Sequence, residues 1–271
     1  MGGHMSELQV LLATMNQQDF SIAKQMNISC DAVIANQADR DCVEQMQTAT
    51  GTWKMITTTT TGVGINRNIG LLAATADVVL FADDDAVYND DMPASVVTAF
   101  QENPQADVII FGIDYVKDGA IIEKRRMQNK RLRVTNAMRY GACAMAVRRE
   151  SLLRNNITFH QKFGGGCSFS AGEDSLFLKT CLDHKLRVYG NEYVLGSCRK
   201  DSSSWFTGYH EKYFYDKGVL LRYLFPKMHY VMAPYFAFFF KRETKLSALR
   251  RLRWILTGIR GGKKMLPFEG K

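Results

Sequence analysis

The chain has 271 residues, of which 46% are hydrophobic and 23% are charged, as is usual for a folded soluble protein. Its six cysteines show no Cys-x-x-Cys spacing, which argues against a zinc cage or a disulfide framework and favours a reducing cytosol. The formal net charge is +8, and the stretch from Lys241 to Lys264, with nine Lys or Arg and one acid, accounts for all of it. Because a protein that coats nucleic acid through its main domain is basic there as well, we expect no nucleic-acid partner.

Strand-like and helix-like segments alternate along the first half of the chain. Leu8 to Thr14 is an apolar run that ends in short polar residues, and Asp31 to Ala35 repeats this arrangement. The pattern further predicts a helix over 21–26, a helix over 41–49, a strand over 53–61, a helix over 93–100 and a strand over 107–111. Such alternation predicts an α/β fold with a mostly parallel, doubly wound sheet.

The first half is organised around one short apolar strand that ends in three carboxylates. Val78 to Phe81 has the composition of a strand covered on both faces, and Asp83, Asp84 and Asp85 follow it. In open α/β sheets ligands bind beyond the carboxyl ends of the strands, where these side chains fall. Adjacent carboxylates repel one another, and Mg²⁺ or Mn²⁺ bound together with substrate phosphates relieves the repulsion. For three aspartates alone, a solvated acidic turn or a helix cap is the more usual explanation, so other motifs have to decide.

A glycine-containing turn and a helix lead into the acidic strand. Gly62 and Gly64 invite comparison with a dinucleotide fingerprint, but no third glycine opens the helix at the required offset, and we reject a dehydrogenase. Arg67 lies at the start of this helix, where it can pair with the carboxylates or contact a diphosphate. An ordinary surface arginine is equally compatible with the spacing.

The second half of the chain contains a second acidic motif. The pattern predicts a basic hairpin or exposed loop over 121–133, a small apolar segment over 140–147, a short helix over 148–153 and a strand over 186–194. Gly164-Gly165-Gly166 predicts a loop, and Glu173 and Asp174 then open a helix whose apolar stripe begins at Leu176. The helix dipole favours carboxylates in a first turn, which is a sufficient structural reason for the pair taken alone.

Taken together, five motifs resemble those of the family-2 glycosyltransferases with a GT-A fold. They are Leu11 to Asn16, Asn66 to Leu71, Phe81 to Asp85 as an Asp-x-Asp motif, Gly141 to Arg149 as an acceptor-side segment, and Gly172-Glu173-Asp174 as a Glu-Asp motif. Their order and separations agree with the family over roughly residues 8–200. The resemblance implies a Rossmann-like sheet flanked by helices in a catalytic domain of residues 6–200, with a nucleotide-sugar half at about 6–115 and an acceptor half at 116–200. Residues 201–271 would form a helical, basic extension, and residues 1–5 resemble a cloning remnant.

What the resemblance implies is sugar transfer from a nucleoside diphosphate sugar to an acceptor hydroxyl, with inversion at the anomeric carbon. Asp83 and Asp85 would hold Mg²⁺ or Mn²⁺ against the diphosphate. Asp84 is assigned to the donor site, although its side chain would point away from the metal. Asp174 would be the general base. Because an ordinary aspartate, with a pKa of about 3.9, is a poor base, burial or the neighbouring Glu173 has to raise that pKa.

The resemblance also implies where the donor binds. Thr14, Asn16, Asn36 and Asp39 lie where such enzymes hold the base and ribose, and Arg67 lies near the diphosphate. The loop from Asn36 to Asp39 departs from the Asp-Asp-rich pattern that is commonest in the family. UDP is therefore expected only because it is the most frequent nucleotide among these enzymes.

Three further residues complete the predicted site. Gly141 lies in the acceptor-side segment, and Trp205, between polar residues and Gly208, is predicted as a platform on which a sugar stacks. His210 follows the last strand, where a histidine in several GT-A enzymes completes the metal shell or contacts the diphosphate. A surface or packing role for His210 is at least as compatible with the sequence.

The C-terminal segment suggests a membrane contact. Tyr223 to Phe240 is apolar and aromatic, but prolines and charges divide it, and it falls short of the ~20 residues of a spanning helix. Lys245 to Arg260 places leucines and isoleucines at helical spacing with Arg250, Arg251 and Arg253 between them. Such a basic amphipathic helix binds an anionic membrane surface or packs on the catalytic domain. We favour the membrane, and expect a cytoplasmic protein that is peripheral on the inner face of the cell membrane and acts on a glycan or lipid-linked glycan of the cell surface.

Two alternatives remain open from the sequence. A sugar nucleotidyltransferase also uses an α/β domain with paired aspartates, but it normally has a glycine-rich loop after the first strand, and Thr14 to Phe20 contains no glycine. A non-catalytic nucleotide- or glycan-binding protein with the GT-A fold is the other alternative, and the presence of both acidic motifs argues against it.

Overall fold

The computed structural model describes residues 7–138, 140–200, 208–239 and 244–262, and the chain forms two compact units. The first unit comprises Met1–Gln161 and Glu173–Ser202, and the second comprises Lys162–Gly172 and Ser203–Lys271. The chain therefore leaves the first unit after Gln161 and returns to it at Glu173, the first residue of the predicted Glu-Asp motif.

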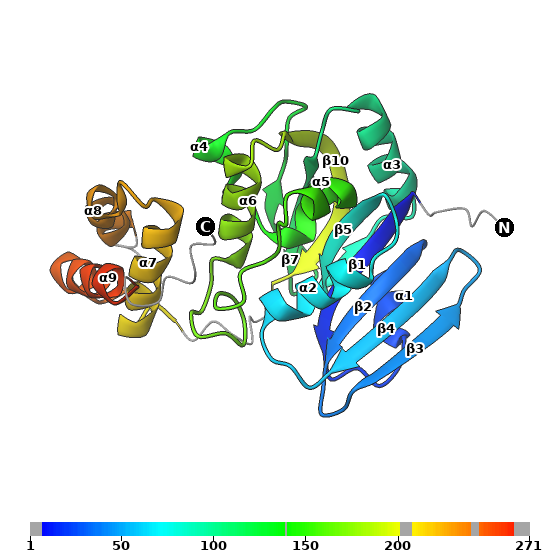
Figure 1. Ribbon diagram of the computed structural model, residues 1–271, viewed down its shortest axis with the longest axis horizontal. Coiled ribbons are helices and arrows are strands. Elements are labelled where there is room, and N and C mark those ends of the chain that lie inside the picture. Colours follow the sequence, from blue (N-terminus) through cyan, green and yellow to red (C-terminus); the bar gives the residue numbers. More distant parts are fainter. Residues whose placement is uncertain (1–6, 139, 201–207, 240–243, 263–271) are drawn as a thin grey trace. The chain divides into compact units, whose positions relative to one another are not determined.

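The first unit is built on one sheet, which in the described residues has ten strands (Figure 1). Their order is β3-β4-β2-β1-β5-β9-β7-β10-β6, and β8 pairs with β7. The strands are β1 (Leu8–Met15), β2 (Asp31–Gln37), β3 (Cys42–Gln47), β4 (Thr52–Thr58), β5 (Val78–Asp83), β6 (Ala86–Tyr88), β7 (Val108–Lys117), β8 (Ala120–Arg125), β9 (Met145–Arg148) and β10 (Val188–Arg199).

The strands β4, β2, β1 and β5 run parallel and form the expected core of the sheet. Their register pairs Ala13 of β1 with Asp83 of β5, and Thr14 of β1 with Asn36 of β2. The polar residues that end these strands therefore meet at one edge of the sheet. The remaining pairings are antiparallel, except that β7 and β10 are parallel.

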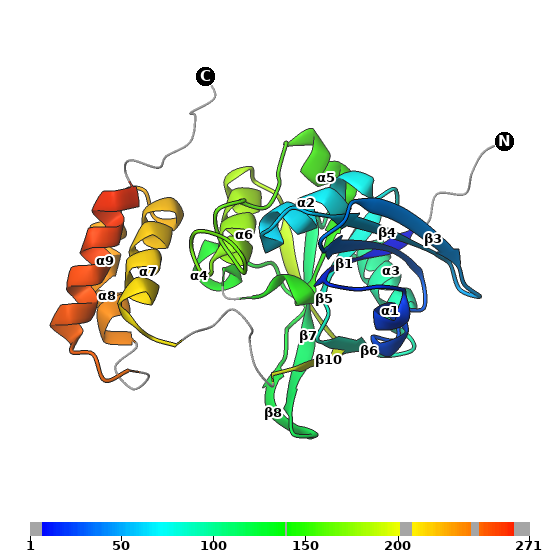
Figure 2. The same cartoon turned by 90° about the horizontal axis from the view of Figure 1, so that it is seen from below.

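Helices cover both faces of this sheet. Figure 2 shows α2 and α5 on one side of the strands and α1 and α3 on the other. The helices of the first unit are α1 (Ser21–Gln25), α2 (Val63–Ala73), α3 (Met92–Glu102), α4 (Val134–Ala137), α5 (Arg149–Arg154) and α6 (Glu173–Asp183), with a 3-10 turn at Ala142–Ala144. Because both faces are covered, β5 is apolar from Val78 to Ala82 and completely buried, as its sequence predicts.

One predicted element of the first unit is wrong. The segment 41–49, expected as a helix, contains the strand β3, which pairs antiparallel with β4 at the edge of the sheet. Four of its six residues are exposed, so the strand lacks the strict alternation of apolar and polar residues that marks a half-buried strand. Pairing with β4, which the local pattern does not report, decides its conformation.

The second unit contains three helices in its described part, α7 (Glu211–Leu224), α8 (His229–Phe239) and α9 (Ala248–Gly262). Its core contains Phe214 and Leu221 of α7, Ala233 and Ala237 of α8, and Ile255 and Ile259 of α9. Two helices approach very closely, because Gly218 of α7 faces the carbonyl oxygen of Ile255 and leaves no room for a Cβ atom. None of the described helices is both long enough and apolar enough to span a bilayer.

The predicted polar face of the C-terminal helix needs a correction. Arg251 is not on the surface: only 2% of it is exposed, and its Nε and Nη1 donate hydrogen bonds to the carbonyl oxygens of Ala237 and Leu246. The guanidinium caps the last turn of α8, whose carbonyl groups have no partner within the helix. Arg250 and Arg253 are exposed, as expected.

Candidate active site

The candidate site lies at the carboxyl ends of the parallel strands. The strand β5 ends at Asp83, and the helices α2 and α6 each bring polar residues to this edge. Arg67 of α2 meets Asp83 and the first two residues of α6, Glu173 and Asp174. Residues separated by about a hundred positions in the sequence thus share one cluster.

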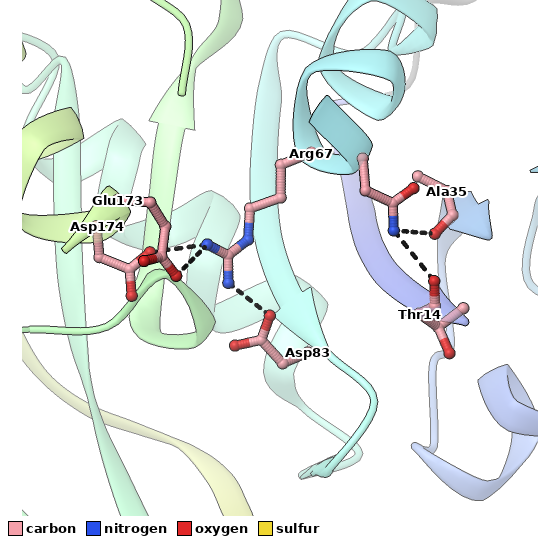
Figure 3. Close-up of polar contacts among 7 residues, drawn as sticks. Thr14, Ala35, Arg67, Asp83, Glu173 and Asp174 are labelled. Atoms are coloured by element: carbon pink, nitrogen blue, oxygen red, sulfur yellow. Dashed lines mark hydrogen bonds and ion pairs between the residues drawn. The ribbon is translucent and has the colours of Figure 1, made fainter. Parts of the chain in front are cut away.

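Arg67 forms the centre of this cluster (Figure 3). Its Nη2 lies 2.7 Å from Asp83 Oδ1, and its Nη1 lies 2.8 Å from Asp174 Oδ1 and 3.4 Å from Glu173 Oε1. The side chain is only 3% exposed, whereas those of Asp83 and Asp174 keep 35% and 23% exposure. Solvent and ligands can therefore reach the carboxylates, but the guanidinium lies behind them. Of the two roles that the sequence left open for Arg67, the structure shows pairing with the carboxylates.

Aromatic side chains from other parts of the chain pack around the buried guanidinium of Arg67. Its guanidinium carbon lies 5.1 Å from the centre of the Phe159 ring, in a cation–π contact. The rings of Phe159 and Phe177 stack at 4.2 Å, and Phe81 of β5 meets both rings edge to face. These three buried aromatic rings pack together beside the ion cluster, and Phe159 contacts the guanidinium directly.

Asp174 has the environment of a general base. Its pKa is raised to about 7, because burial and the charge of the neighbouring Glu173 raise it more than the Arg67 guanidinium lowers it. The carboxylate is thus close to half ionised at neutral pH, which suits a group that has to accept a proton during the reaction. A general base at this position was expected to have a raised pKa, and burial together with Glu173 is the cause in the structure.

The acidic turn after β5 distributes its three carboxylates differently. Asp83 pairs with Arg67, whereas Asp84 Oδ2 accepts a hydrogen bond of 2.7 Å from the hydroxyl of Thr14. Burial, together with the charges of Asp83 and Asp84, raises the pKa of Asp85 to about 6. Asp85 is therefore the carboxylate of the triplet on which a cation would have the greatest effect.

The residues predicted to hold the base and ribose lie in two environments. Asn16 and Asp39 are exposed in loops beyond β1 and β2. Asn36 is completely buried, and its amide bonds to the backbone of Gln17 and to the hydroxyl of Thr57. We therefore correct its assignment, because Asn36 braces the loop after β1 and has no surface for a ligand. Thr14 is 5% exposed and holds Asp84.

Of the remaining predicted residues, Gly141 belongs to the first unit and His210 to the second. Gly141 is adjacent to Asp174, since a Cβ atom there would lie 3.5 Å from Asp174 Oδ2. His210 caps the N-terminus of α7 in the second unit, where its Nδ1 accepts a hydrogen bond from the backbone N–H of Tyr213. Trp205 lies outside the described residues.

Two asparagines of the site were not predicted from the sequence. Asn66 is buried and donates from Nδ2 to the carbonyl oxygens of Thr14 and Ala35, which ties α2 to the ends of β1 and β2. Asn68 bonds to both the carbonyl oxygen and the N–H of Phe159. Three consecutive polar residues, Asn66, Arg67 and Asn68, early in an otherwise apolar helix were the available signal, because such residues are buried only when they have partners.

The chain is similar to a known enzyme family. Residues 20–166 match the family described as Glycosyl transferase family 2, and this is more than half of the chain. The chain belongs to this family. It is a glycosyltransferase, which decides against the nucleotidyltransferase and the non-catalytic binding protein. A search of curated proteins gives no match.

Solved structures show the fold of this glycosyltransferase. The crystal structure of S. aureus TarS 1-349 in complex with UDP-GlcNAc matches with a TM-score of 0.63 at 16% identity, over 96% of this chain and 82% of that chain. The complex of TarS 1-349 with UDP matches with a TM-score of 0.55 at 16% identity, over 93% of this chain and 70% of that chain. At this identity the likeness establishes the fold, and it confirms the predicted GT-A class.

Proposed function

We propose that this glycosyltransferase transfers a sugar from a UDP-sugar to a hydroxyl group of a glycan or lipid-linked glycan, with inversion at the anomeric carbon. The observation that carries the proposal is Asp174, a carboxyl with a pKa of about 7 beside the acidic turn of the sheet edge. The complexes of TarS with UDP-GlcNAc and UDP support a uridine nucleotide as the donor's leaving group.

In the proposed reaction Asp174 accepts the proton of the acceptor hydroxyl. The acceptor oxygen forms a bond to the anomeric carbon, and the bond from that carbon to the diphosphate oxygen breaks, so the electron pair leaves with UDP. Attack from the side opposite the leaving group inverts the configuration. Arg67 and Glu173 bracket the base, and Gly141 leaves open space beside its second carboxylate oxygen.

A divalent cation fits the acidic turn in its chemistry. Asp83 and Asp85 would hold Mg²⁺ or Mn²⁺, since carboxylate oxygens are the ligands these ions prefer. Burial and then the charges of Asp83 and Asp84 raise the pKa of Asp85, and a bound cation would oppose both effects. Within the described residues no group of three or more His, Cys, Asp or Glu side chains is arranged to hold a metal ion. Other ligands would therefore come from the diphosphate and water. Such an ion neutralises negative charge on the departing diphosphate.

The experiment that tests the base is Asp174→Asn, a substitution that keeps the shape and removes the proton acceptor. We expect transfer to fall by about 10²-fold or more, the usual contribution of a general base, while binding of UDP, measured by calorimetry, is retained. In the wild type kcat/KM should rise with pH up to about 7 and then level off, because the base must be deprotonated. Glu192→Gln, an exposed carboxylate on β10, is the control. Full transferase activity of Asp174→Asn would refute the assignment.

We also propose that the second unit binds an anionic membrane, which would place the enzyme at the inner face of the cell membrane. Residues 208–271 contain fourteen Lys or Arg and four Asp or Glu, a formal charge of +10 in a chain whose net charge is +8. The helix α8 exposes a largely aromatic face: Tyr230, Val231, Tyr235 and Phe238 are 53–70% exposed. Aromatic residues beside basic ones are characteristic of interfacial helices. The exposed aromatic residues of α8 and the exposed arginines of α9 therefore both support membrane binding.

A further inference from the structure

A single buried guanidinium connects the two functional halves of the proposed site. Asp83 ends β5 on the donor side, and Asp174 begins α6 on the side of the base. Both bind Arg67, each through a different terminal nitrogen, at 2.7 and 2.8 Å. With Glu173 at 3.4 Å, one positive charge serves three carboxylates.

The position of Arg67 is determined by the anchoring of its helix and by a ring contact, in addition to its ion pairs. Its neighbours Asn66 and Asn68 anchor α2 to the ends of β1 and β2 and to the segment that carries Phe159. The Phe159 ring lies against the guanidinium. Because the Arg67 side chain is held by these contacts, the carboxylates that bind its terminal nitrogens are held at a fixed place relative to the edge of the sheet.

The same geometry argues against direct contact between Arg67 and the donor. Both terminal nitrogens bind carboxylates, and Nε is buried without a hydrogen-bond partner among the described residues. At 3% exposure, the guanidinium offers no surface to a diphosphate.

We propose that Arg67 is a positioning residue, which holds the carboxylate of Asp174 at a fixed place relative to the donor side of the site at Asp83. The inference rests on the proposed function, in which Asp174 is the base. Loss of the Arg67 guanidinium would free the Asp174 side chain to adopt other rotamers. It would also remove the positive charge that offsets the repulsion among Asp83, Glu173 and Asp174. Misplacement of a reacting group by about 1 Å can cost about 100-fold in rate.

The test compares Arg67→Met and Arg67→Lys with the wild type in the full chain. For Arg67→Met we expect kcat to fall by about 100-fold, while the dissociation constant of UDP in the presence of Mn²⁺, from calorimetry, changes little, because the buried guanidinium offers no surface to the diphosphate. The acidic limb of the kcat/KM profile should move to higher pH, because Arg67 no longer opposes the rise in the pKa of Asp174. Arg67→Lys keeps the charge and should restore part of kcat and the pH profile.

The matched control is Arg125→Met. Arg125 also combines an ion pair, to Glu123 at 2.8 Å, with a cation–π contact, to Tyr115 at 4.7 Å, but it belongs to β8. We expect the kcat of Arg125→Met to match that of the wild type. Unchanged kcat in Arg67→Met would overturn the inference, and so would a loss of UDP affinity as large as the loss of kcat. If Arg67→Met does not fold, as judged by near-UV circular dichroism, Arg67→Lys decides: wild-type kcat and pH profile with lost UDP affinity would overturn the inference, whereas lowered kcat with retained affinity supports it.

Failure of this inference is distinguishable from failure of the proposed function. An active Asp174→Asn refutes the base itself, whatever Arg67→Met does. An inactive Asp174→Asn combined with a fully active Arg67→Met leaves the base in place and removes only the role of Arg67.

Discussion

At the scale of single residues, the three aspartates at the end of β5 have three different environments. Asp83 binds Arg67, Asp84 accepts from Thr14, and Asp85 remains with a raised pKa because burial and its two neighbours disfavour its charge. A cation would favour the ionised form of Asp85 most strongly, since the unfavourable interactions concentrate there.

This distribution predicts that Asp85 carries most of the metal dependence. In Asp85→Ala we expect the Mn²⁺-dependent gain in UDP affinity to fall by at least about 10-fold, a loss typical even of groups that only support a metal ligand. Calorimetric titration of UDP with Mn²⁺ and with EDTA measures the gain. Asp90→Ala, an exposed aspartate after β6, should leave it unchanged. An equal gain in Asp85→Ala and the wild type would show that Asp85 does not carry the metal dependence.

At the scale of elements, the composition of one helix agrees with its local preferences, whereas that of another is explained by packing. The helix α6 begins with Glu173 and Asp174, where the helix dipole favours carboxylates, so one local preference serves both folding and the site. The helix α9 instead contains glycines, which are poor helix formers. Close packing explains Gly258, because a Cβ atom there would overlap the carbonyl oxygen of Tyr215 in α7.

The packing of α7 against α9 predicts opposite effects of two similar substitutions. Gly258→Ala should lower the free energy of unfolding by about 1–3 kcal/mol, as overpacking usually does. Gly261→Ala would meet only the hydroxyl end of the Tyr215 side chain, which can move, and should be neutral or stabilising by up to about 1 kcal/mol through its better helix propensity. Urea unfolding of both variants checks this. Equal stability of the two variants would contradict the close approach of the helices.

At the scale of the whole molecule, charge and exposed apolar surface concentrate in the same stretch of chain. Residues 1–207 carry 21 Lys or Arg and 23 Asp or Glu, so the positive charge belongs to the C-terminal part. The exposed aromatic face of α8 lies in that part. Each basic residue near an anionic surface adds about 1 kcal/mol of attraction, and the aromatic rings add interfacial burial.

The membrane proposal predicts that negative charge introduced on the exposed face of α8 abolishes binding to vesicles. In Val231→Glu combined with Tyr235→Glu, both residues are more than half exposed, so the fold should persist while sedimentation with vesicles of phosphatidylglycerol and phosphatidylcholine is lost. These substitutions are preferable to deletion of α9, because deletion would expose the core partners of Ile255. Val43→Glu, at an exposed position of β3, is the control. Unchanged sedimentation of the double variant would refute the proposal.

Much of this protein was determined by its sequence alone. The apolar strand before Asp83, the helix that opens with Glu173 and Asp174, and the helix containing Arg67 all follow from local composition and periodicity, and the order of these motifs pointed to the family. Local patterns suffice there because a doubly covered strand and an amphipathic helix each leave a period in the sequence.

Only the tertiary structure decided which polar side chains meet. Asn36 and Arg251 have sequences around them that suit a ligand contact and a solvated face, yet both are buried by partners distant in the chain. The strand β3 exists because β4 lies beside it. The cluster of Arg67 with Asp83 and Asp174 joins residues up to 107 positions apart. Burial and electrostatic coupling depend on distance in space, which no local pattern encodes, and the raised pKa of Asp174 is their product.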